Sequence, residues 1–206
     1  MEKEKVLVVG TGKSGIAATQ LLVRTGKQPV LFDSNAELKK DEILGRLSLS
    51  EAEKKQVEIV LGDLTEEEKQ SLSGVVLSPG VPTDTEFVND LRDRGLPISG
   101  EIELAFEQEK GTVLAITGTN GKTTTTTLLG EIMKATGKKT FVVGNIGNPY
   151  TLEAEKTDTD SVTVAEISSF QLETIHTFRP RVSAILNITP DHLNRHHTME
   201  NYVKAK

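Results

Sequence analysis

The chain has 206 residues, of which 36% are hydrophobic and 26% are charged, an ordinary globular composition that allows one large or two small domains. The formal net charge is −6 and no run of basic residues occurs, so neither nucleic acid nor an anionic membrane is expected as a main partner. Cysteine is absent, which excludes disulfides and thiolate metal sites. No apolar run is long enough for a signal peptide or a membrane span, and we expect a cytoplasmic, monomeric protein.

The chain opens with a strand, a glycine turn, a helix and a second strand. A strand over residues 5–9 runs into Gly10-Thr-Gly-Lys-Ser-Gly15, a helix follows over 16–24, and a strand over 29–32 ends at Asp33. This is a βαβ unit with a G-x-G-x-x-G turn and an acidic residue after its second strand. Taken alone, the pattern predicts a dinucleotide fold with Asp33 on a ribose hydroxyl. The motif is weak, because any tight turn beside a phosphate needs such glycines.

The first half of the chain continues this alternation. Charged residues over 37–55 predict a solvated helix and loop. Further strands are expected over 57–61, 74–77 and 97–99, with helices over 66–72 and 84–94. The alternation predicts a doubly wound α/β domain, which we place at residues 1–97. The turn Ser78-Pro-Gly-Val-Pro82 either lines the same crevice as the glycine turn or is a plain turn set by its two prolines.

The second half is organised around a predicted phosphate-binding loop. After a connecting helix over 101–109, an apolar strand over 113–116 leads into Gly118-Thr-Asn-Gly121, and Lys122-Thr123 opens a helix that ends near residue 136. The loop is shorter than a full Walker A motif, whose early glycine would stand at Ile116. Lys122 is expected on the β- and γ-phosphates, and the Thr123 hydroxyl on Mg²⁺. The alternative is a tight turn with a solvated lysine.

Polar side chains follow the later strands of this half. Asn145, Glu166, Asp191 and His192 come after strands expected over 139–143, 162–165 and 181–186. The carboxyl ends of parallel strands meet at one edge of a sheet, so these groups are expected to converge on the phosphate loop. Glu166 is interpreted as a Mg²⁺ ligand rather than a surface carboxylate. His196 and His197 are interpreted as capping or loop histidines.

Five motifs in combination resemble the Mur ligases of peptidoglycan synthesis. They are Gly118-Thr-Asn-Gly-Lys-Thr-Thr124, Gly144-Asn-Ile-Gly147, Glu166-Ile-Ser-Ser-Phe-Gln-Leu-Glu173, Asn187-Ile-Thr-Pro-Asp-His192 and Tyr202-Val-Lys-Ala-Lys206. The Ser-Ser-Phe-Gln-Leu-Glu run and the Rossmann-like first domain are most similar to the D-glutamate-adding branch of the family. The resemblance implies a Rossmann-like sheet at 1–97 followed by an incomplete P-loop-type α/β ATPase domain at 98–206. The family's C-terminal domain would be missing, so we expect a fragment that binds substrate without turning over.

The resemblance also implies a reaction and its ligands. ATP would phosphorylate the alanine carboxylate of UDP-N-acetylmuramoyl-L-alanine, and D-glutamate would attack the acyl phosphate to form an amide. Two Mg²⁺ ions are implied, with Thr123, Glu166, His192 and Lys206 at the metal sites. Lys122, His192 and Lys206 are implied as catalytic, and Lys206 matches a lysine that the family carbamylates. The implied ATP contacts are Gly118, Thr119, Asn120, Gly121, Lys122, Thr123 and Thr124.

The resemblance implies that the first domain binds the UDP part of the nucleotide sugar rather than a dinucleotide. The implied contacts are Thr11, Gly12, Lys13, Ser14 and Gly15 in the glycine turn, Asp33, Ser34 and Asn35 after the second strand, and Ser78, Pro79 and Gly80. Asn145, His192, Ser169 and Gln171 would face the muramoyl-alanine part.

Three alternatives remain open at this point. The chain could belong to another Mur-type or folylpolyglutamate-type ligase, although the run from Ser168 to Glu173 argues against it. An NAD(P)-binding module would explain the first domain but would leave the phosphate loop and Glu166 without a role. A non-catalytic nucleotide-binding domain would differ from the enzyme by releasing no phosphate in response to D-glutamate.

Overall fold

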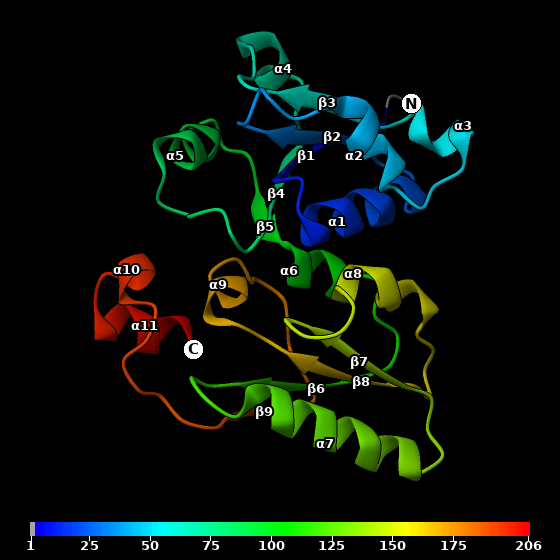
Figure 1. Ribbon diagram of the computed structural model, residues 1–206, viewed down its shortest axis with the longest axis vertical. Coiled ribbons are helices and arrows are strands. Elements are labelled where there is room, and N and C mark those ends of the chain that lie inside the picture. Colours follow the sequence, from blue (N-terminus) through cyan, green and yellow to red (C-terminus); the bar gives the residue numbers. More distant parts are fainter. Residues whose placement is uncertain (1–2) are drawn as a thin grey trace. The chain divides into compact units, whose positions relative to one another are not determined.

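The computed structural model describes residues 3–206 and divides the chain into two compact units, Met1–Leu104 and Ala105–Lys206 (Figure 1). The boundary therefore differs from the one predicted after residue 97. The reason is strand β5 (Ile98–Gly100), which pairs in parallel with β4 (Gly74–Leu77) and so completes the first sheet. Helix α6 (Glu101–Phe106) runs across the boundary.

The first unit contains a parallel five-stranded sheet in the order β3-β2-β1-β4-β5. Its remaining strands are β1 (Lys5–Val9), β2 (Gln28–Asp33) and β3 (Glu58–Leu61). Its helices are α1 (Lys13–Arg24), α2 (Lys40–Gly45), α3 (Glu51–Lys54), α4 (Glu66–Gln70) and α5 (Glu86–Asp93). The strand order reverses between β1 and β4, and ligands of open α/β sheets bind at such a point, outside the carboxyl ends of the strands.

The first sheet is covered on both faces, as the alternation of side chains in β1 shows. Val6 and Val8 belong to one buried apolar cluster together with Leu21 of α1. Leu7 and Val9 belong to a second cluster together with Leu91 of α5. Because successive strand residues point to opposite faces, the two clusters lie on opposite sides of the sheet. The predicted doubly wound α/β fold is confirmed.

The second unit contains a parallel four-stranded sheet in the order β7-β8-β6-β9. The strands are β6 (Thr112–Thr117), β7 (Thr140–Gly144), β8 (Val162–Glu166) and β9 (Val182–Ile185). The helices are α7 (Lys122–Ala135), α8 (Tyr150–Glu153), the 3-10 turn η1 (Ala154–Lys156), α9 (Ser169–Leu172), α10 (Leu193–His196) and α11 (Met199–Ala205). Figure 1 shows α7 on one face of this sheet and α8 and α9 on the other.

The last strand in that order, β9, lies at the edge of the sheet and pairs with β6. Val182 and Ile185 are 58% and 51% exposed, so this edge is apolar, and no strand within residues 3–206 pairs with its outer side. None of the helices within residues 3–206 is both long and apolar enough to cross a membrane.

Helix α1 begins at Lys13, three residues before the start that the sequence predicts, and this brings Gly15 into its first turn. A Cβ atom on Gly15 would lie 1.8 Å from the carbonyl oxygen of Gly10, far inside van der Waals contact. The absence of a side chain at Gly15 therefore allows α1 to pack directly against the end of β1.

Gly15→Ala is expected to lower the free energy of unfolding by roughly 1–3 kcal/mol, because the helix must move away from the strand. Gly45 is a matched control, since it is also helical and no neighbouring atom lies within 4 Å of its added Cβ. Gly45→Ala is expected to be neutral or stabilising by up to about 1 kcal/mol. Urea unfolding of the two variants measures both effects, and equal stability of Gly15→Ala and the wild type would contradict the packing argument.

Candidate functional site

The phosphate loop of the second unit lies between the end of β6 and the first residue of α7. Gly118 and Gly121 have φ angles of 142° and 84°, in the region that favours glycine. A Cβ on Gly118 would lie 3.1–3.2 Å from atoms of Leu186 and Asn187. The loop thus runs close against the chain that follows β9, and its amides precede a helix N-terminus, where anions bind.

Asn187 holds this loop in place. The Asn187 carbonyl accepts from the Thr119 N–H at 3.0 Å, and its side-chain oxygen accepts from the Asn120 N–H at 2.9 Å. The side-chain amide of Asn187 donates in turn to the Asn120 carbonyl at 3.0 Å. Asn187 is absent from the predicted site residues. Its position directly after the strand expected over 181–186, like that of Glu166 after the strand expected over 162–165, is the signal that could have identified it.

Two lysines approach the base of the loop. Lys122 Nζ donates to the carbonyls of Gly118 and Thr119, both at 2.9 Å. Lys206 Nζ donates to the same Gly118 carbonyl at 2.9 Å and to the Thr117 hydroxyl at 3.0 Å. Burial lowers the pKa of Lys206 to about 8, the positive charge of Lys122 adds to this, and Asp191 and Glu166 oppose it. Lys206 therefore loses its proton more readily than an ordinary lysine.

Glu166 is the buried centre of the site. The residue ends β8, is 1% exposed, and accepts the Thr123 hydroxyl at 2.9 Å through Oε2 and the Asn145 amide at 2.8 Å through Oε1. The structure thus brings together three of the predicted residues, which come from α7, β8 and the loop after β7. A buried carboxylate needs such partners, because it loses its hydration.

The donors around Glu166 fit a magnesium ion that phosphate also binds. Carboxylate and hydroxyl oxygens are the ligands that Mg²⁺ prefers, and it usually keeps waters and substrate phosphates besides one or two carboxylates. Within residues 3–206 no group of three or more His, Asp or Glu side chains could hold a metal by itself. Glu166 and Thr123 therefore suit a shared protein–phosphate site rather than a closed protein cage.

His192 lies on the outer side of this region. The residue has a φ of 52°, its side chain is 47% exposed, and Nε2 lies 3.4 Å from Asp191 Oδ2. Its ring contacts that of Phe170, with centroids 4.9 Å apart. Within the described residues, neither a hydrogen bond nor an ion pair joins His192 to Glu166, so the four predicted metal residues do not form one set of contacts.

Ser169 and Gln171 make their observed hydrogen bonds within the polypeptide. The two side chains are 2% and 3% exposed. Gln171 completes a capping box with Ser168 at the start of α9, and Ser169 Oγ lies 2.9 Å from His196 Nε2. These contacts place both residues inside the fold, although the sequence predicts that they face substrate. Thr124, on the first turn of α7, is exposed.

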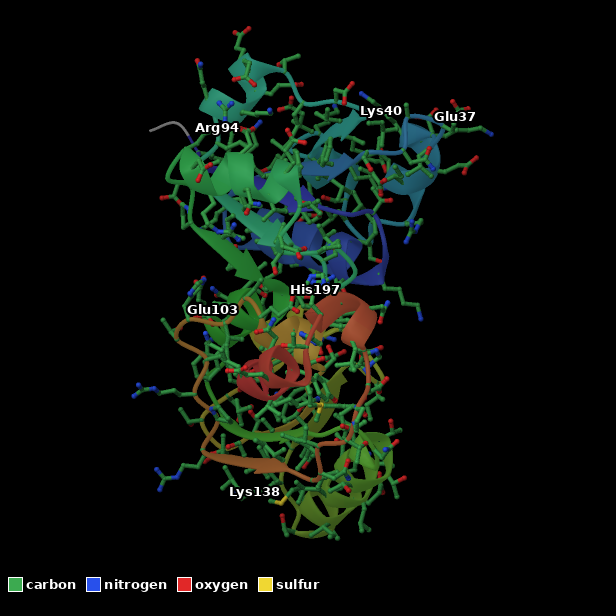
Figure 2. The ribbon with its side chains drawn as sticks, turned by 90° about the vertical axis from the view of Figure 1, so that its left-hand side faces the viewer. Glu37, Lys40, Arg94, Glu103, Lys138 and His197 are labelled. Carbon is green, nitrogen blue, oxygen red and sulfur yellow. The ribbon has the colours of Figure 1, made fainter. Side chains whose placement is uncertain are left out.

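The interpretation of His196 as a capping or loop histidine is wrong. The residue is 5% exposed and packs between the rings of Phe170 and Tyr202, with centroid distances of 5.5 and 5.2 Å. Helices α10 and α11 fold over α9, a tertiary arrangement that the local pattern does not indicate. His197, labelled in Figure 2, directly follows α10 and is exposed.

The first unit has a cavity of about 520 Å³ at the carboxyl ends of its strands. Three of the predicted nucleotide contacts, Asp33, Ser34 and Gly80, line it. Phe32 and Phe87 form an apolar wall, with their rings stacked 5.0 Å apart. Phe87 is not among the predicted contacts, because an aromatic residue in a helix is most often part of the core.

Asp33 is tied to the glycine turn. Its Oδ2 accepts the Thr11 N–H at 3.1 Å and the Thr11 hydroxyl at 2.8 Å, and its Oδ1 accepts the Asn35 N–H at 3.1 Å. Burial acts to raise the pKa of Asp33, but these hydrogen bonds outweigh it and lower that pKa below its ordinary value. The carboxylate therefore stays charged and fixes the turn.

Ser78 lies beside the same turn. Its buried hydroxyl oxygen has no hydrogen-bond partner within the described residues, and a Cβ on Gly10 would lie 3.0 Å from it. The predicted contacts Gly12 and Lys13 are exposed, Ser14, Asn35 and Pro79 are exposed or half-buried, and Gly15 is buried. The unpaired and buried Ser78 oxygen thus lies beside the point where the strand order reverses.

Comparison with known families assigns both units. A Mur ligase MurD-like N-terminal domain matches residues 4–100, and a Mur ligase middle domain matches residues 116–206. Two similar proteins are UDP-N-acetylmuramoylalanine–D-glutamate ligases, from Lachnoclostridium phytofermentans (61% identity over 98% of this chain) and Lachnospira eligens (53% over 100%). The chain spans 44% and 45% of their respective lengths.

Solved structures agree on the fold. The chain aligns over 99% of its length with 66% of a UDP-N-acetylmuramate:L-alanyl-gamma-D-glutamyl-meso-diaminopimelate ligase from Neisseria meningitides, at a TM-score of 0.58 and 16% identity. A murein peptide ligase from Psychrobacter arcticus aligns over 98% of the chain and 46% of its own length, at a TM-score of 0.52 and 18% identity. Since the two matched domains follow one another along the chain and account for both units, the chain belongs to the Mur ligase family.

Proposed function

We propose that this chain is the nucleotide-binding part of an ATP-dependent ligase that joins D-glutamate to UDP-N-acetylmuramoyl-L-alanine in peptidoglycan synthesis. The observation that carries the proposal is the buried Glu166 carboxylate, which is held by Thr123 beside the phosphate loop and by Asn145. The names of the relatives with 61% and 53% identity support the choice of D-glutamate.

In the proposed reaction the phosphate loop binds ATP. The N-terminus of α7 faces the phosphates, and Lys122 moves from the loop carbonyls onto the β- and γ-oxygens. The γ-phosphoryl group passes to the alanine carboxylate, ADP leaves, and the amine of D-glutamate attacks the acyl phosphate. Loss of phosphate and a proton then leaves the amide. Phosphoryl transfer needs mainly positioning and charge neutralisation, which these groups supply.

Magnesium is proposed at Thr123 and Glu166, where it would neutralise charge on the phosphates. A second ion is proposed near His192 and Lys206. For Lys206 to serve there, its amine would first be carbamylated by CO₂, which converts a cation into an anionic oxygen ligand. Only an uncharged amine reacts with CO₂, and the lowered pKa of Lys206 favours that form.

The nucleotide part of the sugar substrate is proposed to bind the first unit. The cavity with Asp33, Ser34 and Gly80 would hold the nucleoside, with the glycine turn and Ser78 beside it. Asn145, Ser169 and Gln171 remain proposed at the muramoyl-alanine part, the last two by shaping the chain around it.

A titration of Lys206 tests the proposed role of its amine. The Cε signal of Lys206 in an NMR titration is expected to have its midpoint near pH 8, below the ordinary lysine value of 10.5. The folded state disfavours the charged amine, so the stability of the folded chain is expected to rise between these two values and to change less in Lys206→Met. A midpoint at the ordinary value would remove the argument for carbamylation at this site.

A thermal melt tests the nucleotide assignment. UDP-N-acetylmuramoyl-L-alanine at about 100 times its dissociation constant is expected to add roughly 2.7 kcal/mol to native stability, a shift of several degrees. NADH at the same concentration is expected to have no effect. The chain should release no ADP in response to D-glutamate. A shift with NADH alone would overturn the assignment of the first unit, and D-glutamate-dependent ADP release would show that this part is catalytically sufficient.

Lys122→Ala tests the phosphate loop in a ligase of full family length that carries this sequence. Loss of the ammonium group is expected to lower turnover by at least about 10²-fold, because charge on the phosphates loses its counterion, while UDP-sugar binding is unchanged. Lys134→Ala is the control, since Lys134 lies on the same helix and pairs with Glu131 on its exposed face. Near-normal turnover of Lys122→Ala would contradict the assignment.

A further inference from the structure

The cluster around His196 consists of Ser169, Phe170, Glu173, His196 and Tyr202, and it joins three short helices. His196 Nδ1 lies 3.3 Å from Glu173 Oε1, and Nε2 lies 2.9 Å from Ser169 Oγ. A neutral imidazole satisfies both contacts if Nδ1 carries the proton and Nε2 accepts from the serine hydroxyl. Burial, the largest cause, lowers the pKa of His196 and so favours this neutral form.

The His196 ring, on which Tyr202 packs, is held by contacts at both of its nitrogens. Its position is set at both nitrogens by α9 and the residue that follows it, and the Tyr202 ring packs on it with a centroid distance of 5.2 Å. Arg195 holds the second oxygen of Glu173 at 2.7 Å and lies over the Phe170 ring. Glu173 is therefore oriented from two sides, and the imidazole cannot rotate without breaking a contact.

The Tyr202 phenol contacts the phosphate loop at the Thr119 hydroxyl. Its oxygen lies 2.9 Å from Thr119 Oγ1. That hydroxyl donates to the Thr189 carbonyl at 3.1 Å and accepts from the Thr189 N–H at 3.0 Å. A hydroxyl has one hydrogen, so all three contacts are satisfied together when the Tyr202 O–H donates to Thr119 and the Thr119 O–H donates to the Thr189 carbonyl. Every hydrogen-bonding position of Thr119 Oγ1 is then filled.

We infer that His196 and Tyr202 are positioning residues that hold the phosphate loop in its nucleotide-binding form through the Thr119 hydroxyl. The inference rests on the proposed function, since it needs ATP in this loop. The chain of contacts runs from Ser169 and Glu173 to His196, then to Tyr202 and Thr119. The same helix, α11, ends at Lys206, which bonds to the carbonyl of Gly118 in the loop. Neither His196 nor Tyr202 needs to touch the nucleotide.

The second tyrosine of the chain provides a matched control. Tyr150 is also fully buried in the second unit, and its hydroxyl donates to Glu109 at 2.8 Å, which is not part of the phosphate loop. Loss of either phenol oxygen removes one buried hydrogen bond and leaves the ring. A purely structural role predicts similar behaviour of the two variants, whereas a positioning role predicts that Tyr202 alone affects nucleotide binding.

The decisive experiment measures the affinity of Mg·ATP for this chain by NMR titration, with thermal melts of the same samples. Tyr202→Phe is expected to weaken binding roughly fivefold, because one hydrogen bond to the loop is lost. Tyr150→Phe is expected to lower the melting temperature and leave the affinity unchanged. Equal affinities of Tyr202→Phe and the wild type would overturn the inference alone, while a wild-type chain that does not bind ATP would overturn the proposed nucleotide site as well.

A double-mutant cycle tests whether His196 acts through Tyr202. His196→Phe keeps a ring between Phe170 and Tyr202 but loses both nitrogen contacts, and it is expected to weaken Mg·ATP binding. In the Tyr202→Phe background the same change should have little further effect, since the contact to Thr119 is already gone. Additive losses of Mg·ATP affinity would overturn the inference that His196 acts through Tyr202. If His196→Phe does not fold, the comparison of the two tyrosine variants still decides whether Tyr202 positions the loop.

Discussion

The second unit depends on the burial of one charge. Glu166 sits at the end of a central strand with almost no exposed surface, and a carboxylate in that position requires donors. Thr123 and Asn145 provide them, and each comes from the segment after a different strand. The parallel arrangement makes this possible because every strand ends at the same edge of the sheet. Binding of a cation would relieve the same constraint, so the fold and the proposed chemistry place the same demand on Glu166.

The loop next to Glu166 accepts hydrogen bonds from two lysine side chains. Lys122 and Lys206 both donate to the Gly118 carbonyl, although two ammonium groups that share one acceptor repel each other. The repulsion contributes to the lowered pKa of Lys206. Triphosphate would offer Lys122 stronger acceptors than the loop carbonyls, and its departure would leave Lys206 with less repulsion. The proposed nucleotide binding would thereby be coupled to the charge state of Lys206 through one carbonyl oxygen.

Much of this arrangement can be predicted from the sequence, because local signals dominate it. The strands that end at Val9, Thr117 and Glu166 are apolar runs followed by glycine or polar residues, and the structure has them within a residue or two of the expected bounds. The sequence does not predict helices α8, α9 and α10. Each has four residues, too short for a hydrophobic period, and depends on tertiary packing.

The same distinction between local sequence signals and tertiary packing applies to the site. The proximity of Thr123, Asn145 and Glu166 could be inferred from strand topology, since each is next to a strand end. The burial of His196 and the contact of Tyr202 with Thr119 could not, because they require α10 and α11 to fold over α9. Sequence patterns indicate which residues belong to one helix or strand. The packing of short helices against each other depends on side-chain shape.

The open edge at β9 affects how the isolated chain behaves in solution. An apolar strand with unpaired main-chain groups is a template for another strand, and two such edges can pair between molecules. Pro180 and Arg181 stand directly before β9, where an imino acid and a positive charge hinder the approach of a second edge. Self-association through β9 would compete with folding at high concentration. Dilution would oppose it, and so would low ionic strength, at which the Arg181 side chains of two molecules repel each other.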